Sequence, residues 1–447
     1  MTETKGSEDI STRLRRIAKT AREHPEWVLT TLAHHIDIDL LREAHEETRK
    51  DGAVGVDGQT AESYARELDK NLMELLERLK SGSYFAPPVR RVYIPKDGGK
   101  TRPLGIPTFE DKVLQRAVAM VLAAVYEQDF KRCSYAYRPG RSAHHALSDL
   151  RTAMMSMSGC TVIEVDIEGF FDTLDHGHLR SFLDLRVKDG VIRRMVDKWL
   201  KAGVLEDGAL RASEAGTPQG GVISPLLANI YLHHVIDLWW TREVQPRLRG
   251  RAVLVRYADD IAIACEREDD AHRIMKALPG RLEKYGLRLH PSKTRLVDFG
   301  APRENDERDD GDGTRPRTFD FLGFFHHWAK SRKGNWVIKQ RTACKRFARS
   351  CRALAKWCRR NRHAPLKDQH QGLCRRLSGH YNYFGITGNY DALHRFWCVA
   401  KKSWRKWLCR RSTSARKPWE WFTALWERLP LPRPRAVHSA YRLSAKP

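Results

Sequence analysis

Two adjacent acidic residues interrupt an apolar run, and this run constrains the fold more than any other feature of the sequence. In AVLVRYADDIAIAC (residues 252–265) the flanking residues are mostly apolar and β-branched. Such a pattern predicts two strands that meet at Asp259 and Asp260. A carboxylate among apolar residues is unfavourable unless a cation or an exposed turn compensates its charge. The run therefore predicts either a surface turn or a cation site.

A second apolar segment, TVIEVD, also ends in a carboxylate, Asp166. Strands that deliver carboxylates to one place can bind Mg²⁺, which takes a few carboxylates together with substrate phosphates. Two such ions can activate a 3′-hydroxyl and stabilise a leaving pyrophosphate. A nucleoside triphosphate also needs positive charge, which Lys100 and Arg102 on the predicted hairpin of residues 89–107 could supply.

Basic residues are concentrated in the last part of the chain. Residues 330–447 contain 30 Lys and Arg but four acidic residues, a net charge of +26, whereas the first 329 residues are nearly neutral. The same segment holds eight of the 13 tryptophans. Segregated positive charge indicates binding to a polyanion, with nucleic acid as the leading candidate. Aromatic residues interleaved with arginine suit an ordered RNA-binding surface. A core role for the tryptophans is compatible with this interpretation.

The composition excludes several classes of protein. No apolar run approaches the roughly 18 residues of a membrane span, and the polar N-terminus does not resemble a secretory signal. The nine cysteines include no CxxC pair, so we expect free thiols in a reducing compartment. Cys344, Cys351 and Cys358 recur every seventh residue, which favours helix packing over zinc binding.

Strands and helices alternate up to about residue 325, and the basic segment that follows is mostly helical in pattern. An α+β unit followed by a basic helical unit is therefore expected. Thr108 is a candidate cap for the helix that starts at residue 109. Asp172 and Asp175 follow Asp166 and are interpreted as capping or turn residues.

At the level of ordered motifs, the chain resembles bacterial group II intron reverse transcriptases, also called maturases. The matching blocks, in the order of that family, are GAVGVDGQT, RRVYIPKDGGKTRPLGIPT, RCSYAYRPGRSAHHAL, VIEVDIEGFFDTLDH, GTPQGGVISPLLANIYLH, VRYADDIAIA, YGLRLHPSKTRLV and FDFLGF. The resemblance implies a right-hand polymerase fold with fingers and palm, followed by an all-α basic thumb or maturase domain. The basic C-terminal segment resembles that domain.

The implied boundaries are an N-terminal helical extension at 1–50, fingers and palm at 51–325, the RNA-binding thumb at 326–430 and a short tail at 431–447. Asp166 and Asp259 would be the main metal ligands. Asp260 would complete the catalytic site and Ile167 would lend a backbone carbonyl.

The resemblance also implies a nucleotide pocket. Phe171 would exclude a ribose 2′-hydroxyl, with Phe170 packed in the core. Gln219 and Gly220 would line the pocket, and Lys100 and Arg102 would hold the triphosphate. Lys293 would act on the leaving group, although a solvated loop lysine is the alternative interpretation. The members of this set are Lys100, Arg102, Phe171, Gln219, Gly220 and Lys293.

By the same resemblance the cofactor would be two Mg²⁺ ions, with Mn²⁺ as a possible substitute. The partners would be group II intron RNA, an RNA template with a DNA primer, target DNA and deoxynucleotides, in the bacterial cytoplasm near the nucleoid. We expect no HNH endonuclease domain. The alternatives are a domesticated relative in host defence or DNA repair, a splicing cofactor with a vestigial polymerase, and a general basic RNA-binding protein.

Overall fold

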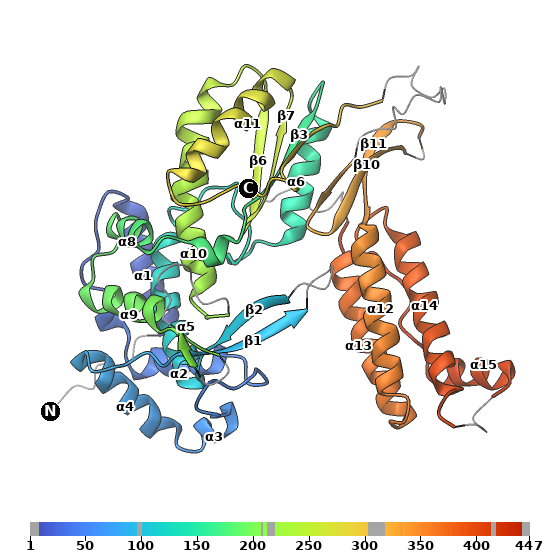
Figure 1. Cartoon of the computed structure of the whole chain (residues 1–447), viewed down its shortest axis with the longest axis horizontal. Helices are drawn as coiled ribbons and strands as arrows, with labels where there is room; N and C mark the ends of the chain where they lie inside the picture. The colour runs from blue at the N-terminus through green and yellow to red at the C-terminus, as the bar shows by residue number, and fades with distance from the viewer. Residues whose placement is uncertain are drawn as a thin grey trace.

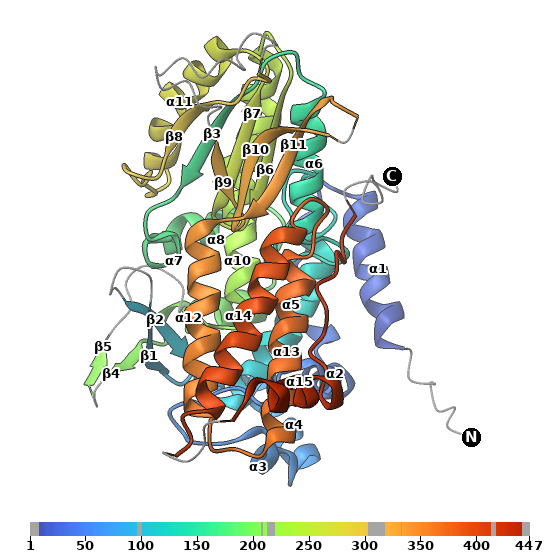
Figure 2. The ribbon, with the colours of Figure 1, turned by 90° about the vertical axis from the view of Figure 1, so that its right-hand side faces the viewer.

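The computed structural model of the chain has mixed α and β content, as predicted, and its last helices stand beside the rest of the molecule (Figure 1). Figure 2 shows the same arrangement after a rotation of 90°. None of the helices in the described ranges is both long and apolar enough to span a membrane. The structure describes residues 9–95, 101–206, 209–211, 220–302, 318–331, 333–412 and 417–439.

A four-stranded antiparallel sheet carries the acidic strands. Its order is β6-β7-β3-β8, with bounds β6 Ala252–Tyr257, β7 Asp260–Cys265, β3 Thr161–Asp166 and β8 Arg295–Asp298. β3 pairs with β7 along its whole length, ending at Asp166 opposite Asp260. β6 pairs with β7 up to Tyr257 opposite Asp260. The two strands predicted to meet at the Asp pair are confirmed.

Both faces of this sheet are buried, which explains why its strands are almost entirely apolar. Neighbouring residues point to opposite faces, so Ile163 and Ile261 join the larger apolar core while Val162 and Ala262 join a second core. Helix α11 (Glu268–Glu283) packs on the first face and helix α6 (Ala143–Met155) on the second. The carboxylates lie at the strand ends.

Most remaining helices of the first part surround the larger core. Their bounds are α1 Ile10–Glu23, α2 Ile38–Glu47, α3 Ala61–Ala65, α4 Leu68–Ser81, α5 Phe109–Tyr126, α7 Phe170–Thr173, α8 His176–Asp184, α9 Gly190–Lys201 and α10 Ser224–Leu232. Thr108 caps α5 as predicted, because its side chain accepts a hydrogen bond from the Asp111 N–H. Asp175 likewise caps α8.

The N-terminal helices belong to the same core as the rest of the first part. α1 and α2 both pack on α5. The buried Arg186 donates hydrogen bonds to the backbone carbonyls of Ala21 and Trp27, at 2.8 and 2.6 Å. The Asp189 carboxylate accepts one from the Leu32 N–H at 2.7 Å. Packing is therefore continuous across residue 50.

The predicted hairpin is present as β1 (Val89–Pro95) and β2 (Thr101–Ile106), paired antiparallel. Its turn, which includes Lys100, lies outside the described residues. β4 (Val204–Glu206) and β5 (Ala209–Arg211) complete a sheet of order β2-β1-β4-β5.

A small sheet precedes the final helices. It consists of β9 (Phe319–Phe321), β10 (Phe324–Lys330) and β11 (Trp336–Thr342). The segment FDFLGFFHHW forms two strands, because Leu322 and Gly323 both have positive φ and make a two-residue turn between β9 and β10. β10 alternates buried and partly buried residues, which is the period of a strand, and the helices that follow this sheet begin at Cys344.

Helices α12 (Cys344–Arg360), α13 (Leu366–Phe384), α14 (Tyr390–Leu408) and α15 (Trp419–Arg428) have an apolar core of their own. Leu373, Leu377 and Trp404 are among its buried members. The expected cysteine stripe is only partly in this core, since Cys358 is buried and Cys344 is exposed. All nine cysteines are free thiols, as predicted.

Candidate active site

The strand register brings three carboxylates together. Asp166 ends β3 and lies opposite Asp260, the first residue of β7. Asp259 occupies the turn between β6 and β7. Residues directly opposite each other in an antiparallel pair have Cα atoms about 4.5–5.5 Å apart. The three side chains are therefore neighbours, although Asp166 is remote from the others in the sequence.

The turn that carries Asp259 has two residues, and its first residue is strained. Ala258 has a φ of 56°, a conformation that residues other than glycine rarely adopt. Strain of this kind costs about 1 kcal/mol or more and persists only where the surroundings enforce it. Here it fixes the direction in which the Asp259 side chain leaves the sheet.

A fully buried arginine supports this turn. The Arg256 guanidinium makes a bidentate ion pair with Asp237, with N···O distances of 2.8 and 2.6 Å. It also donates to Asn229 Oδ1 at 3.0 Å, to Ser134 Oγ at 2.8 Å and to the Ala258 carbonyl at 3.3 Å. Sequence analysis did not single out this residue. The available signal was an arginine inside an apolar strand, which must be paired when it is buried.

Basic side chains from three elements surround the carboxylates. Lys293 Nζ, just before β8, lies 2.9 Å from Asp166 Oδ2. Arg102 on β2 and Arg346 in the first turn of α12 exert favourable electrostatic effects on the two aspartates of the Asp pair. The site thus combines negative charge on the sheet with positive charge on the hairpin and on the final helices.

The carboxylates of the Asp pair ionise less readily than those of free aspartates. Burial is the main cause that raises the pKa of Asp259. Burial, followed by the charges of Asp259 and Asp166, raises the pKa of Asp260 to about 6. Asp260 is exposed to solvent, but it lines a cavity of about 390 Å³ in which protein surrounds the carboxylate. A cation bound beside these groups would stabilise their charged forms.

Ile167 is buried directly after Asp166. The chain here forms an isolated bridge to the segment before β8. The backbone N–H of Glu168 donates to the Arg288 carbonyl at 2.9 Å, and the backbone N–H of His290 donates to the Asp166 carbonyl at 2.8 Å. The Ile167 carbonyl takes part in neither bond, so the bridge leaves this carbonyl available.

The two phenylalanines after β3 differ in their neighbours. Phe170 is almost completely buried and packs against Tyr231, with ring centroids 6.3 Å apart. Phe171 is 9% exposed, and the Arg102 guanidinium carbon lies 6.0 Å from its ring centroid. Phe171 is therefore the aromatic residue on the side of the basic hairpin.

Gly220 allows its segment to approach β2 very closely. Its φ is 117°, and a Cβ at this position would lie 2.4 Å from the Gly105 carbonyl oxygen. Only glycine fits such a contact without displacing the backbone. The segment containing Gly220 therefore lies against the strand that carries Arg102. Gln219 lies outside the described residues, as does Lys100.

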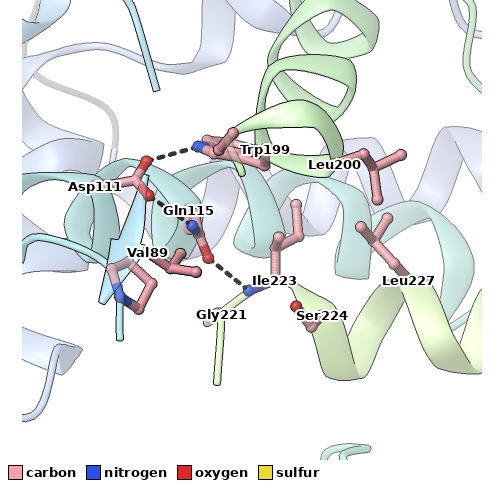
Figure 3. A pocket seen from close by; sticks show the side chains of 11 residues that line it. Val89, Asp111, Gln115, Trp199, Leu200, Gly221, Ile223, Ser224 and Leu227 are labelled. Carbon is pink, nitrogen blue, oxygen red and sulfur yellow. Dashed lines mark hydrogen bonds between the residues drawn. The ribbon is translucent and has the colours of Figure 1, made fainter. Parts of the chain in front are cut away.

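A buried polar cluster anchors the start of α10, immediately after this segment (Figure 3). The Asp111 carboxylate accepts hydrogen bonds from Trp199 Nε1 at 2.6 Å, Gln115 Nε2 at 2.8 Å and the Tyr84 hydroxyl at 2.9 Å. Gln115 Oε1 in turn accepts one from the Ile223 N–H at 3.3 Å. Helices α5 and α9 thereby fix the backbone three residues after Gly220.

Tyr137 is a second residue at the site that sequence analysis missed. It has a φ of 56° and is 59% exposed. Burial is the main cause that raises the pKa of Tyr137, and the charge of Asp259 is the second. The phenol therefore lies within electrostatic range of the carboxylates. The sequence block around it was matched to the family, but its backbone conformation cannot be read from residue types.

The site fits a divalent ion that arrives with its substrate. Among the described residues, no group of three or more His, Cys, Asp or Glu side chains forms a ready metal cage. Mg²⁺ does not require one, because it usually binds one or two carboxylates and completes its shell with water and substrate phosphates. The carboxylates of Asp166 and Asp259 present oxygen atoms of the kind that Mg²⁺ binds, and burial, the main cause that raises the pKa of Asp259, makes a nearby cation favourable.

Residues 94–326, just over half of the chain, match the family described as "Reverse transcriptase (RNA-dependent DNA polymerase)". All the residues described above that surround the carboxylates, except Arg346, lie within this range. The chain therefore belongs to the reverse transcriptase family and is by its family an RNA-directed DNA polymerase.

Two relatives indicate the branch of the family. Protein YkfC of Escherichia coli (strain K12) is 36% identical over 325 residues, which cover 64% of this chain and 81% of YkfC. The group II intron-encoded protein LtrA of Lactococcus lactis subsp. cremoris is 39% identical over 228 residues, which cover 50% of this chain and 37% of LtrA. The chain is a reverse transcriptase of the group II intron type.

Proposed function

We propose that the chain copies RNA into DNA by two-metal-ion nucleotidyl transfer at the carboxylate site. Asp166 and Asp259 would hold divalent ions, most readily Mg²⁺, with Asp260 and the Ile167 carbonyl completing the site. Bound ions of this kind activate a 3′-hydroxyl and stabilise the leaving pyrophosphate. The observation that carries the proposal is the register that sets Asp166 opposite Asp260 with Asp259 in the adjoining turn.

The nucleotide would lie between this site and β2. Arg102 would pair with the triphosphate, since a guanidinium can bind phosphate oxygens in a bidentate geometry. The close approach of Gly220 to β2 supports a pocket that is lined on one side by backbone atoms. Phe171 would occupy the position of a ribose 2′-hydroxyl and so select deoxynucleotides. Lys100 and Gln219, in segments adjoining the described parts of β2 and α10, would complete the pocket.

Lys293 would have two positions in the reaction. Without substrate it neutralises Asp166. Its side chain is more than half exposed, so it can move to the leaving pyrophosphate when a cation takes its place beside the carboxylate. There its ammonium group would stabilise the developing negative charge or donate a proton.

Primer extension tests the assignment. With Mg²⁺, a primed RNA and deoxynucleotides, the purified chain should extend the primer, and a chelator should stop extension. Asp259→Ala should slow extension roughly a thousandfold or more, because the loss of a metal ligand removes several kcal/mol of transition-state stabilisation. RNA binding should remain. Glu283→Ala, an exposed acidic position on α11, is the control and should extend normally. Normal extension by Asp259→Ala would refute the site.

Helices α12–α15, which we call the helical part, would bind RNA, including group II intron RNA, and support splicing and mobility. Its excess of Lys and Arg over acidic residues and the printed name of LtrA support this proposal. Intron structure in the DNA flanking the gene, and splicing of that intron only when the purified chain is added, would test it. The absence of intron structure would favour a role independent of splicing.

A further inference from the structure

Helices α14 and α15 enclose a groove of about 740 Å³, and its lining residues include none of those described at the carboxylate site. Its walls consist of basic and indole side chains together with two cysteines. The residues are Trp397, Cys398, Lys401, Lys402, Arg405, Lys406, Cys409, Arg410, Trp419 and Trp426. We call it the α14–α15 groove.

The five cations of the groove have no carboxylate partner among the described residues. Lys401 and Arg405 are one helical turn apart and form one row along α14. Lys402 and Lys406 form the next row, and Arg410 follows just past the end of the helix at Leu408. Like charges at this spacing repel each other. A row of uncompensated cations is therefore stabilised by a ligand that carries regularly spaced negative charge, as a nucleic-acid backbone does.

Indole rings hold two of these cations in place. Lys401 Nζ lies 4.5 Å from the Trp397 ring centroid and 3.9 Å from that of Trp426. The Arg405 guanidinium carbon lies 4.1 Å from the Trp419 centroid. Such contacts attract cations to the ring face. They restrict long side chains before any ligand arrives, which lowers the entropic cost of binding.

The groove also offers groups that an anion or a base can use. The Nε1 atoms of Trp397 and Trp426 are buried and lack a hydrogen-bond partner within the part of the chain that the structure describes. Unpaired buried donors are unfavourable. Trp419 at the rim is 51% exposed. A basic groove with an exposed aromatic ring is the arrangement that binds single-stranded nucleic acid, with phosphates on the cations and a base stacked on the ring.

The α14–α15 groove is separate from the carboxylate site. In Figure 1, α14 and α15 lie on the outer side of the helical part, away from the sheet that carries Asp166. Figure 2 views that outer side and shows both helices in front. The first turn of α12, by contrast, faces the carboxylates through Arg346. A segment bound in the groove would therefore lie away from the carboxylates.

We propose that the α14–α15 groove binds a single-stranded segment of RNA as a second nucleic-acid contact, outside the polymerase site. The inference deepens the proposed RNA-binding role of the helical part. The ligand is recognised by its phosphodiester backbone and one stacked base, without sequence readout.

The proposal is tested by measuring how tightly the full chain binds a short unstructured RNA. Fluorescence anisotropy gives this affinity at several salt concentrations. The triple variant Lys402→Gln/Lys406→Gln/Arg410→Gln changes three exposed residues. We expect roughly tenfold weaker binding or more, and a salt slope shallower by about 2, at roughly 0.7 per lost phosphate contact. Trp419→Ala should weaken binding about fivefold or more without a change in slope, because stacking is not ionic.

The matched control removes the same kind of charge elsewhere. Lys19→Gln/Lys201→Gln/Lys276→Gln changes three exposed lysines on α1, α9 and α11 and should leave affinity and slope close to those of the wild type. Circular dichroism spectra equal to that of the wild type show that the variants are folded, and extension of a preformed short primer–template at saturating concentration should be equal in all of them.

Three results would overturn the inference. One is unchanged RNA affinity in the groove variants. Another is an equal loss for a blunt RNA duplex, which would point to duplex binding. The third is equally tight, groove-dependent binding of a polyglutamate peptide, which would point to an acidic protein partner. Because binding and extension are read separately, loss of RNA binding in the groove variants supports the inference even if the wild type extends no primer.

Discussion

The carboxylate-bearing sheet and the helices α12–α15 differ in how the charges of their side chains are compensated. In the sheet, the charge that the fold itself requires is paired internally, as in the buried contact between Arg256 and Asp237. In the α14–α15 groove, the cations are held against indole rings and have no carboxylate partner in the described ranges. The fully buried ion pair therefore has a structural role, whereas the crowded carboxylates of the Asp pair and the cations of the groove mark where ligands are expected.

The largest expected effect on stability lies in the sheet. Asp237→Ala should lower the free energy of unfolding by roughly 3–5 kcal/mol, because it leaves the guanidinium of Arg256 buried without its counter-ion. The double variant Asp237→Leu/Arg256→Met should lose less, since it removes both charges. Denaturant unfolding followed by circular dichroism measures both. If the single variant were as stable as the wild type, this pair would not be the support of the turn.

A smaller effect concerns the buried Asp111 and depends on pH. Burial raises the pKa of Asp111 to about 6, from its ordinary value of 3.8. The folded chain binds a proton on Asp111 more tightly than the unfolded chain does. The protonated carboxyl therefore adds to the free energy of unfolding below pH 4, and this stabilisation is lost as the pH rises to about 6 and beyond. The stability of the wild type relative to Asp111→Asn should fall by roughly 3 kcal/mol across this range. Parallel stability curves would contradict the prediction.

Arg102 should show a smaller, kinetic effect. Arg102→Ala should raise KM for deoxynucleotides about tenfold, because a charge-assisted contact to phosphate is lost. Arg102→Lys should recover part of the loss, since it keeps the charge but not the two-pronged geometry. Steady-state primer extension with varied nucleotide concentration measures this. An unchanged KM in the alanine variant would place the triphosphate elsewhere.

The smallest expected effect is on the stability of the helical part. Lys402→Gln, at an exposed groove position, should change the free energy of unfolding by no more than about 0.5 kcal/mol. A slight gain is expected, because repulsion within the row of cations is reduced. A loss of several kcal/mol would mean that the groove cations are structural after all, and the contrast with the sheet would disappear. The measurement is the same denaturant unfolding.

Much of the site could be predicted because its residues are attached to strong local patterns. The apolar strands around Asp166, Asp259 and Asp260 are evident from alternation and β-branching, and ordered motifs placed them in one family. The supporting residues were not predicted. Arg256 and Asp111 become important only through partners distant in the sequence. The strained conformation of Ala258 depends on those partners.

The sequence by itself determined the acidic strands, the segregation of positive charge into the last quarter of the chain and the family. Local periodicity and composition carry this information directly. The tertiary structure decided that Asp166 faces Asp260, that Arg102, Lys293 and Arg346 reach the same carboxylates from three elements, and that α14 and α15 enclose a basic groove. Such arrangements depend on packing between segments far apart in the chain, and no local pattern specifies them.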